Sequence, residues 1–340
     1  MRISHQIIAH TPSGTPVYGF RMENSTGAYV ELTNLGARWT AAAVPDITGR
    51  LSNVIMGYEN PEDYLTDDFY MGATVGRFAN RIAGASFIIN GHSYTLERND
   101  GENTNHSGHS GFHRKLWNWA IKENCVVFSL LSPDGEGGYP GNVQVSVEYE
   151  WSESHELTIR YHGTTDRPTY LNLTNHAYFN LSNRKGKVTE HLLRIPSHTI
   201  LDTTQDFIPT GIRTNVGGTP FDFSAEKAIG KDLYADHIQL KWNKGYNHCY
   251  ILKEERNDRM MKAAQLYEPE SGRVLTVRTD LPAVLLYTAG YYTHPHTAVC
   301  LETQYYPDTP SHADFPSCLL RPGEEYRQTT IFAFGNIMAH

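Results

Sequence analysis

The chain has 340 residues, of which 39% are hydrophobic and 19% charged, a balance typical of a folded globular protein rather than a disordered one. Its formal net charge of -8 and pI near 6.1 give no electrostatic drive toward nucleic acid or an anionic membrane, because such binding requires clustered Lys and Arg. One large domain is compatible with this length, since all-β chains often exceed 200 residues around one core.

The N-terminal residues 1–6 lack the charged and then apolar layout of a secretory signal. No apolar run approaches the ~20 residues needed to span a bilayer. We therefore expect a cytoplasmic protein without membrane or nucleic-acid partners. Four cysteines are widely separated and form no C-x-x-C, so we expect reduced thiols rather than a zinc ribbon or a disulfide framework: Cys125, Cys249, Cys300 and Cys318.

The strand signals begin with a hairpin. Asn90-Gly91 is the preferred type I′ turn pair, and it separates residues 87–89 from Tyr94. A Gly- and Pro-rich loop follows at 133–141. Period-two alternation then predicts a half-buried strand whose apolar members are Val143, Val145, Val147, Tyr149 and Trp151.

A second strand is predicted by Leu157, Ile159 and Tyr161, which follow a short polar turn and complete an antiparallel hairpin. The best helical candidate is residues 224–233, which contain Gly230 and have weak boundary signals. No linker or repeat divides the chain. We therefore predict an all-β fold, a large antiparallel β-sandwich with few short helices, built as a single domain over 1–340.

One possible acid and one possible base stand out. His176 lies in Asn-His-Ala-Tyr-Phe-Asn at 175–180, and Glu302 opens Glu-Thr-Gln at 302–304. Histidine titrates near neutrality and can deliver a proton, while a carboxylate can remove one. Histidines flanked by aromatic residues are also common in protein cores, so the pair alone leaves a structural interpretation open.

Further motifs occur in a fixed order along the chain, and they lie at 76–82 (GRFANRI), 105–108 (NHSG), 111–112, 138–141 (GYPG), 175–180, 210–211, 221–223 (FDF), 302–304, 307–308 and 321–324 (RPGE). Together they resemble the aldose 1-epimerases, the galactose mutarotase family. The resemblance covers nearly the whole chain. It implies a galactose mutarotase-like supersandwich with an open sugar-binding cleft, and a cofactor-free enzyme that interconverts the α and β anomers of a free aldohexose such as galactose or glucose.

By the family pattern, Glu302 is the catalytic base and His176 the catalytic acid of sugar ring opening, and their roles reverse on closure. The substrate-binding residues that the resemblance implies are Asn80, Arg81, His106 and Asn247. The expected partner is a monosaccharide, and the chain is expected to be a monomer or a homodimer.

Three positions differ from the family pattern. Asn247 replaces the usual Asp of Tyr-Asp-His, and Leu285 stands where a glutamine is common, so a different or broader sugar preference is a hypothesis. Ser107 replaces a glycine after His106. That change is harmful only if the position requires a positive φ, which glycine adopts at low cost.

Two alternative functions stay open at this point. A sugar-binding or regulatory protein without turnover is motivated by Asn247 and Leu285, and a mutarotase for a different or charged sugar is a further possibility. His106, His109 and His113 have a spacing that could hold a metal, but a clear carboxylate ligand is missing from that loop, and we expect no metal site. The sequence contains no P-loop and no complete dinucleotide fingerprint, so we expect no cofactor.

Overall fold

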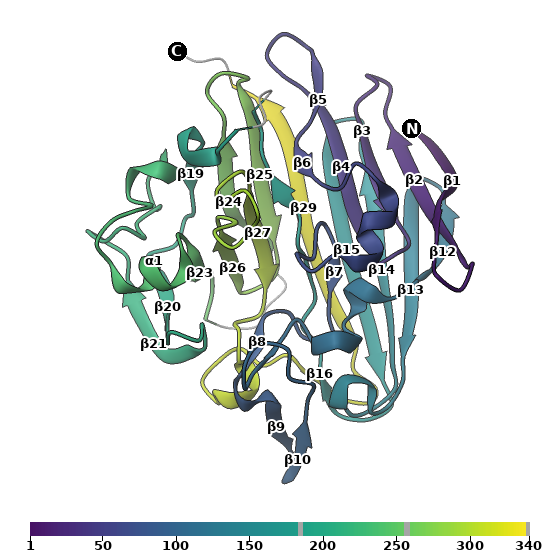
Figure 1. Ribbon diagram of the computed structural model, residues 1–340, viewed down its shortest axis with the longest axis vertical. Coiled ribbons are helices and arrows are strands. Elements are labelled where there is room, and N and C mark those ends of the chain that lie inside the picture. The colour runs from purple at the N-terminus through teal and green to yellow at the C-terminus, as the bar shows by residue number, and fades with distance from the viewer. Residues whose placement is uncertain (183–185, 255–258, 338–340) are drawn as a thin grey trace.

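The computed structural model describes residues 1–182, 186–254 and 259–337, and most of its elements are strands (Figure 1). The largest sheet has nine strands, and every pairing within it is antiparallel. In spatial order it contains β12 (Asn118–Lys122), β13 (Cys125–Ser132), β14 (Val143–Trp151), β15 (Glu156–Thr165), β29 (Tyr326–Asn336), β25 (Arg273–Thr279), β24 (Met261–Tyr267), β19 (Leu192–Arg194) and β22 (Lys227–Ala228).

Two further sheets are also antiparallel. The seven-stranded sheet contains, in spatial order, β21 (Pro209–Asn215), β20 (Thr199–Thr203), β23 (Asn247–Ile251), β26 (Ala283–Tyr287), β27 (Val299–Gln304), β18 (Tyr178–Phe179) and β6 (Ile55–Met56). The five-stranded sheet contains β1 (Arg2–His10), β2 (Pro16–Glu23), β3 (Tyr29–Thr33), β4 (Arg38–Pro45) and β5 (Leu51–Asn53).

Short strand pairs and helical turns complete the fold. The pairs are β9 (Ser86–Ile89) with β10 (His92–Thr95), β8 (Arg81–Ile82) with β11 (Thr104–Asn105), β16 (Thr169–Tyr170) with β28 (Leu319–Leu320), and β7 (Thr74–Val75) with β17 (Thr174–Asn175). The helical elements are α1 (Ile238–Asn243) and the 3-10 turns Pro61–Thr66, Ala83–Ala85, Gly108–Ser110, Phe112–Arg114, Glu136–Gly138, Val188–Glu190, Ile229–Lys231 and Thr309–Ser311. Within the described part of the chain, no helix has the length and apolar character needed to cross a lipid bilayer.

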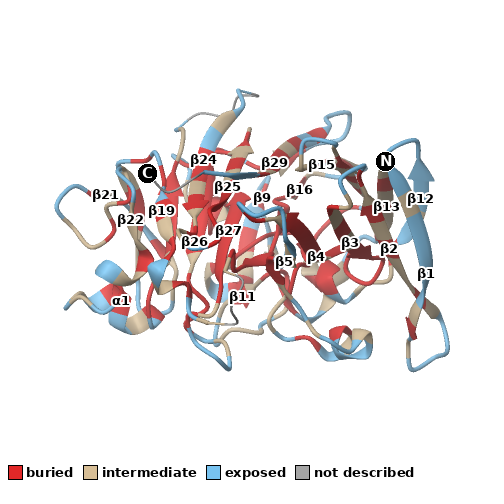
Figure 2. Cartoon of the chain, turned by 90° about the horizontal axis from the view of Figure 1, so that it is seen from above, coloured by how far each residue is buried: buried red, intermediate tan, exposed pale blue. Residues whose placement is uncertain are grey.

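An aromatic cluster joins the three sheets. The ring of Trp39 on β4 lies 5.6 Å from that of Phe179 on β18 and 5.2 Å from that of Phe332 on β29. Phe179 and Phe332 are 5.6 Å apart. Aromatic rings at these separations pack favourably beyond their area burial. The central strands around this cluster are largely buried, whereas β1 and β12 at the rim are exposed (Figure 2).

The predicted alternation is confirmed in β14, where all five apolar side chains are buried and the intervening residues face outward. β14 and β15 form the expected hairpin. Asn90 and Gly91 both have positive φ, 51° and 79°, as a type I′ turn requires. The all-β sandwich expected from the sequence is therefore confirmed.

The predicted helix over 224–233 is wrong. Lys227 and Ala228 instead pair with β19 as a short edge strand, followed by the 3-10 turn Ile229–Lys231. The α-helix of this region is α1, ten residues further on, where a ring nitrogen of His237 accepts the backbone N–H of Gln239 at the helix start. Pairing with a strand distant in sequence outweighs the weak local preference for helix.

All four cysteines have free thiols, as expected. Cys249, Cys300 and Cys318 are buried, and Cys125 is partly buried.

Candidate functional site

His176 lies between β17 and β18, and its backbone is held by the loop before β7. Its N–H donates to the carbonyl of Ala73, and its carbonyl accepts from Gly72, both at 2.9 Å. Asn175 donates from its side-chain amide to the carbonyl of Gly72 at 2.8 Å. Gly72 has φ of 65°, and a Cβ there would lie 1.9 Å from the carbonyl oxygen of Trp39. The loop therefore needs a glycine at 72, and Asn175 holds the backbone around His176.

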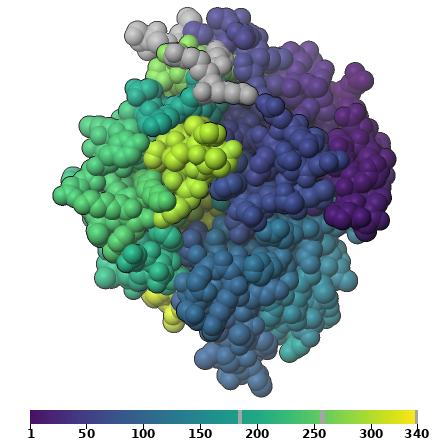
Figure 3. Space-filling view, in the orientation of Figure 1, coloured from purple at the N-terminus to yellow at the C-terminus, as the bar shows by residue number. Residues whose placement is uncertain are grey.

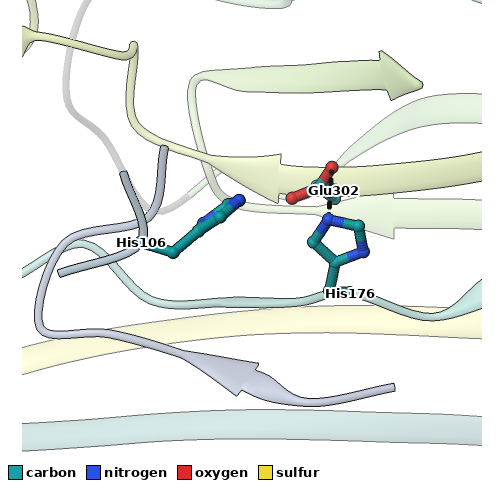
Figure 4. A group of neighbouring side chains, drawn as sticks. All are labelled: His106, His176 and Glu302. Atoms are coloured by element: carbon teal, nitrogen blue, oxygen red, sulfur yellow. Dashed lines mark ion pairs between the residues drawn. The ribbon is translucent and has the colours of Figure 1, made fainter. Parts of the chain in front are cut away.

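Two tyrosine rings enclose the imidazole of His176. Tyr178 stacks on it at 5.0 Å and Tyr70 at 5.8 Å, each with an interplanar angle of 24°. On the remaining edges, Nδ1 lies 3.6 Å from the Cys300 thiol, and Nε2 lies 3.6 Å from Oε1 of Glu302 (Figure 4). The stacked rings restrict the imidazole to one plane, so Nε2 is directed at the carboxylate.

Glu302 lies on β27 and is buried. Within the described part of the chain, its Oε2 atom has no hydrogen-bond partner. Burial raises the pKa of Glu302 to about 8, an effect that the positive charge of Arg81 partly opposes. Burial also lowers the pKa of His176 to about 4, because a low-dielectric site disfavours the imidazolium. Between these values the pair holds one proton, and the order of the two pKa values places it on Glu302 beside a neutral His176.

His106 brings a second imidazole to the same place. One ligand atom from each of His106, His176 and Glu302 lies within 4.8 Å of the others, and the His106 ring points toward Glu302 (Figure 4). Nδ1 of His106 accepts the backbone N–H of Asn80 at 3.1 Å. Burial lowers the pKa of His106 well below its ordinary value. The ring is therefore neutral, with its proton on Nε2, where it can act as a hydrogen-bond donor.

Arg81 follows Asn80 at the edge of the site. Its Nε donates to Oδ2 of Asp100 at 2.6 Å, and its guanidinium lies over the Phe207 ring, 4.7 Å from the ring centre. Among the described residues, none accepts a hydrogen bond from either Nη atom of Arg81. Asn80 has φ of 69°, and its Oδ1 accepts the backbone N–H of Arg81 at 2.8 Å. Asn80 thus orients both His106 and Arg81 through backbone contacts.

A small cavity of about 10 Å³ collects the remaining predicted residues. Asn80, Arg81 and Asn247 line it together with Leu285. Asn247 begins β23 and is partly buried. No described residue bonds to its side-chain amide, which is thus available to a ligand. The six predicted residues therefore form two adjacent groups, the His106–His176–Glu302 cluster and this cavity, joined through Asn80.

A larger hollow of about 1330 Å³ lies elsewhere, between the five-stranded sheet and the segment that contains Tyr292. It includes none of the predicted site residues. In the space-filling view the yellow-green surface near residue 290 adjoins the blue surface near residue 65 (Figure 3). This agrees with the edge contact between the rings of Phe69 and Tyr292, whose centres are 5.0 Å apart. The large hollow is therefore not the candidate catalytic site, because proton transfer requires the buried titratable groups of His106, His176 and Glu302.

Two histidines and one carboxylate are also a donor set that can hold a divalent cation. The hydrogen bond to His106 bears on this possibility. Because Asn80 donates to Nδ1, neutral His106 carries its proton on Nε2, whereas a metal needs a lone pair there. The arrangement therefore suits proton transfer better than metal binding. His109, which the sequence offered as a ligand with His106 and His113, is exposed and lies outside this cluster.

Sequence motifs did not indicate several contacts in and around the site. Tyr70 packs against His106 and His113, each with ring centres 4.5 Å apart, and gave no motif of its own. His296, which lies in none of the motifs, is buried, with Nδ1 3.0 Å from the carbonyl oxygen of Thr288. Tyr287 also lies near His176, with ring centres 6.3 Å apart. Three further tyrosines are buried: Tyr246, Tyr305 and Tyr306.

The profile of the family described as aldose 1-epimerase matches residues 19–333. The chain belongs to the aldose 1-epimerase family. It is 36% identical to a galactose mutarotase of Rattus norvegicus over 344 aligned positions, which cover 98% of each chain. It is 34% identical to an aldose 1-epimerase of Escherichia coli (strain K12), covering 96% of this chain and 97% of the relative.

Solved structures of the aldose 1-epimerase family have the same fold. A galactose 1-epimerase from Lactobacillus acidophilus matches with a TM-score of 0.86 at 26% identity, covering 98% of this chain and 99% of the other. An aldose epimerase homologue from C. elegans matches with a TM-score of 0.85 at 27% identity, covering 93% and 98%. Family membership makes the chain an isomerase-class mutarotase and does not favour the alternative of a non-catalytic sugar-binding protein.

Proposed function

We propose that this mutarotase interconverts the α and β anomers of a free aldohexose such as galactose or glucose, with Glu302 as base and His176 as acid. The observation that carries the assignment is the 3.6 Å approach of Nε2 of His176 to Oε1 of Glu302 in a buried site. The pair holds one proton at neutral pH, because the pKa of Glu302 is raised to about 8 and that of His176 is lowered to about 4.

Ring opening needs two coordinated proton movements. Glu302, as the carboxylate, removes the proton of the C1 hydroxyl, and His176, as the imidazolium, protonates the ring oxygen. This productive form contains the same number of protons as a neutral imidazole beside a protonated carboxyl. The bond between C1 and the ring oxygen then breaks, and the C1 carbonyl forms. No net proton enters or leaves the site during this step.

Closure on the other face uses the same groups in reverse. The C1–C2 bond of the open chain rotates, His176 removes the proton from the C5 hydroxyl, and Glu302 returns a proton to the new C1 hydroxyl. His106 supplies an Nε2–H donor to the C1 and ring-oxygen region. Arg81 offers its two Nη groups to other sugar hydroxyls, with Asn80 and Asn247 beside it in the cavity. Every step is a proton transfer, a bond rotation, or the breaking or re-forming of the bond between C1 and the ring oxygen, so the proposed reaction uses no cofactor.

Polarimetry of freshly dissolved α-D-galactose and α-D-glucose tests the proposal. We expect interconversion faster than in buffer, and loss of about 10²–10⁴-fold in kcat for Glu302→Gln or His176→Asn, since each removes one positioned proton carrier. Glu148→Gln changes a carboxylate of similar size on the outward face of β14 and is expected to keep full activity. Full activity of Glu302→Gln, or no acceleration by the unmodified protein, would contradict the mechanism.

The remaining expectations concern the whole chain. A single domain over 1–340 is supported by one buried cluster that includes residues from Phe20 to Phe334. A cytoplasmic location and a lack of nucleic-acid partners are further proposals, and the net charge of -8 supports the second, because binding to phosphate backbones requires clustered Lys and Arg. Monomer and homodimer both remain proposals, and light scattering coupled to gel filtration distinguishes them.

A further inference from the structure

One row of side chains crosses the seven-stranded sheet. Leu285 on β26 is directly opposite Glu302 on β27, and Cys249 on β23 is directly opposite Leu285. Residues opposite each other in an antiparallel pair project from the same face, and adjacent strands are ~4.8 Å apart. His176 lies on the other side of Glu302, 3.6 Å away. The order along the row is therefore acid, base, leucine and cysteine.

The apolar end of this row borders the small cavity. Leu285 and Cys249 line it with Leu201, Phe207, Pro209 and Pro307. Leu201, Cys249 and Leu285 also belong to one buried apolar cluster, so the cavity wall beside the base is a packed hydrophobic surface. The cavity volume of about 10 Å³ corresponds to about one water-sized group. Its polar members, Asn80, Arg81 and Asn247, are the residues that the proposed function assigns to sugar binding.

The proposed function fixes the direction of the sugar along the row, and the inference rests on it. The ring oxygen lies at His176 and the C1 hydroxyl at Glu302. The next ring carbon on the side away from the ring oxygen is C2, so its substituent is directed at Leu285. Leucine has no hydrogen-bonding group, and a hydroxyl buried against it without a partner is disfavoured. Hydroxyls further around the ring can still reach Arg81 and Asn247.

We propose that Leu285 is a specificity-determining residue and that this mutarotase favours 2-deoxy aldoses, in which C2 carries hydrogen in place of the hydroxyl. An apolar wall discriminates against an added hydroxyl by up to about 10²-fold, much less than a hydrogen-bonding site discriminates against a missing one. The expected preference for the 2-deoxy sugar is therefore about tenfold. A glutamine at this position would supply both a donor and an acceptor to the C2 hydroxyl.

The test compares D-galactose, 2-deoxy-D-galactose and 6-deoxy-D-galactose by anomeric-proton exchange in NMR. Each kcat/KM is divided by the rate of that sugar in buffer, because the sugars differ in intrinsic reactivity. We expect the unmodified enzyme to favour 2-deoxy-D-galactose over D-galactose by about tenfold, with 6-deoxy-D-galactose similar to D-galactose. In Leu285→Gln, we expect the ratio of normalised kcat/KM for 2-deoxy-D-galactose to that for D-galactose to fall by at least tenfold. In Leu285→Met, where the side chain stays apolar, we expect this ratio to be unchanged.

The outcomes separate the two proposals. If none of the sugars is interconverted faster than in buffer, the proposed function fails. If D-galactose is interconverted and is favoured tenfold or more over its 2-deoxy form, only the substrate inference fails. If 6-deoxy-D-galactose, and not 2-deoxy-D-galactose, is favoured over D-galactose, the inferred orientation of the sugar with C2 at Leu285 is wrong. The ratios in the unmodified enzyme decide these points even if Leu285→Gln does not fold.

Discussion

The thiol of Cys300 lies 3.6 Å from Nδ1 of His176, on the edge of the imidazole opposite Glu302. Cys300 and Glu302 are two residues apart on β27, so their side chains project from the same face of the sheet. The thiol can donate to Nδ1 of the neutral imidazole, and its sulfur can accept the Nδ1–H of the imidazolium, so the contact orients the ring in both protonation states. One strand therefore supplies both the base and a group that orients the acid.

Removing this contact should weaken catalysis without abolishing it. A hydrogen bond contributes about 0.5–1.5 kcal/mol, so we expect Cys300→Ala to lower kcat by about 3–10-fold. Cys300→Ser keeps a donor and should retain more activity than the alanine variant. Equal activity of the two variants would show that the thiol only fills space.

The rate profile itself should be bell-shaped, with limbs near pH 4 and pH 8. Burial lowers the pKa of His176 to about 4 and raises the pKa of Glu302 to about 8. As the pH falls below about 4, the pair gains a second proton and has no base. As the pH rises above about 8, the pair loses its last proton and has no acid. The two limbs belong to the coupled pair rather than to either residue alone.

This profile is measured as kcat/KM in mixed buffers of constant ionic strength. Circular dichroism at each pH checks that the protein stays folded, so that a limb reports titration rather than unfolding. A monotonic rise in activity through pH 8 would be incompatible with a pair that needs one bound proton.

The sequence was informative where local chemistry determines structure. The alternation in β14 and the Asn90-Gly91 turn depend on neighbouring residues, and both are found as predicted. The helix over 224–233 failed because Lys227 and Ala228 pair with β19, which is distant in the sequence. Pairing of that kind depends on residues that a local pattern does not include.

The identities of the main site residues could be predicted from the sequence, but their contacts could not. Ordered motifs identified His176 and Glu302, but their 3.6 Å approach depends on β18 and β27 being neighbours in a sheet. Tyr70 carried no signal, because its role comes from packing on His106 and His176. Arg77, in the same motif as Arg81, instead donates to the carbonyls of Pro133 and Pro140.

Arg81 should contribute mainly to sugar binding. Its Nε is already bonded to Asp100, the residue lines the cavity, and no described residue accepts a hydrogen bond from either Nη group. Lysine keeps the charge but not this planar fork. A hydrogen bond to a charged group contributes about 1.5–3 kcal/mol, so Arg81→Lys should raise KM by about tenfold or more with a smaller change in kcat.

Two variants serve as controls for the Arg81 measurement. Asp100→Asn removes the charge that holds Nε and should give a smaller rise in KM than Arg81→Lys. Arg98→Lys changes an exposed arginine paired with Glu102 and should leave KM unchanged. A fall in kcat at constant KM for Arg81→Lys would instead place Arg81 in the chemical step.

Ser107 occupies a position that does adopt positive φ, 64°, and its side chain offsets the cost. Its Oγ accepts the buried backbone N–H of Phe78 at 2.7 Å and lies 3.2 Å from the Tyr139 hydroxyl. Ser107→Ala would keep the left-handed backbone and leave the N–H of Phe78 unpaired, a loss of about 1–3 kcal/mol. Ser107→Gly loses the same bonds but relieves the strain, which is about 1–2 kcal/mol for a residue with a Cβ. Urea unfolding should therefore rank the proteins as serine, glycine and alanine in decreasing stability. Greater stability of the alanine variant than of the glycine variant would mean that the backbone at 107 is not left-handed in solution.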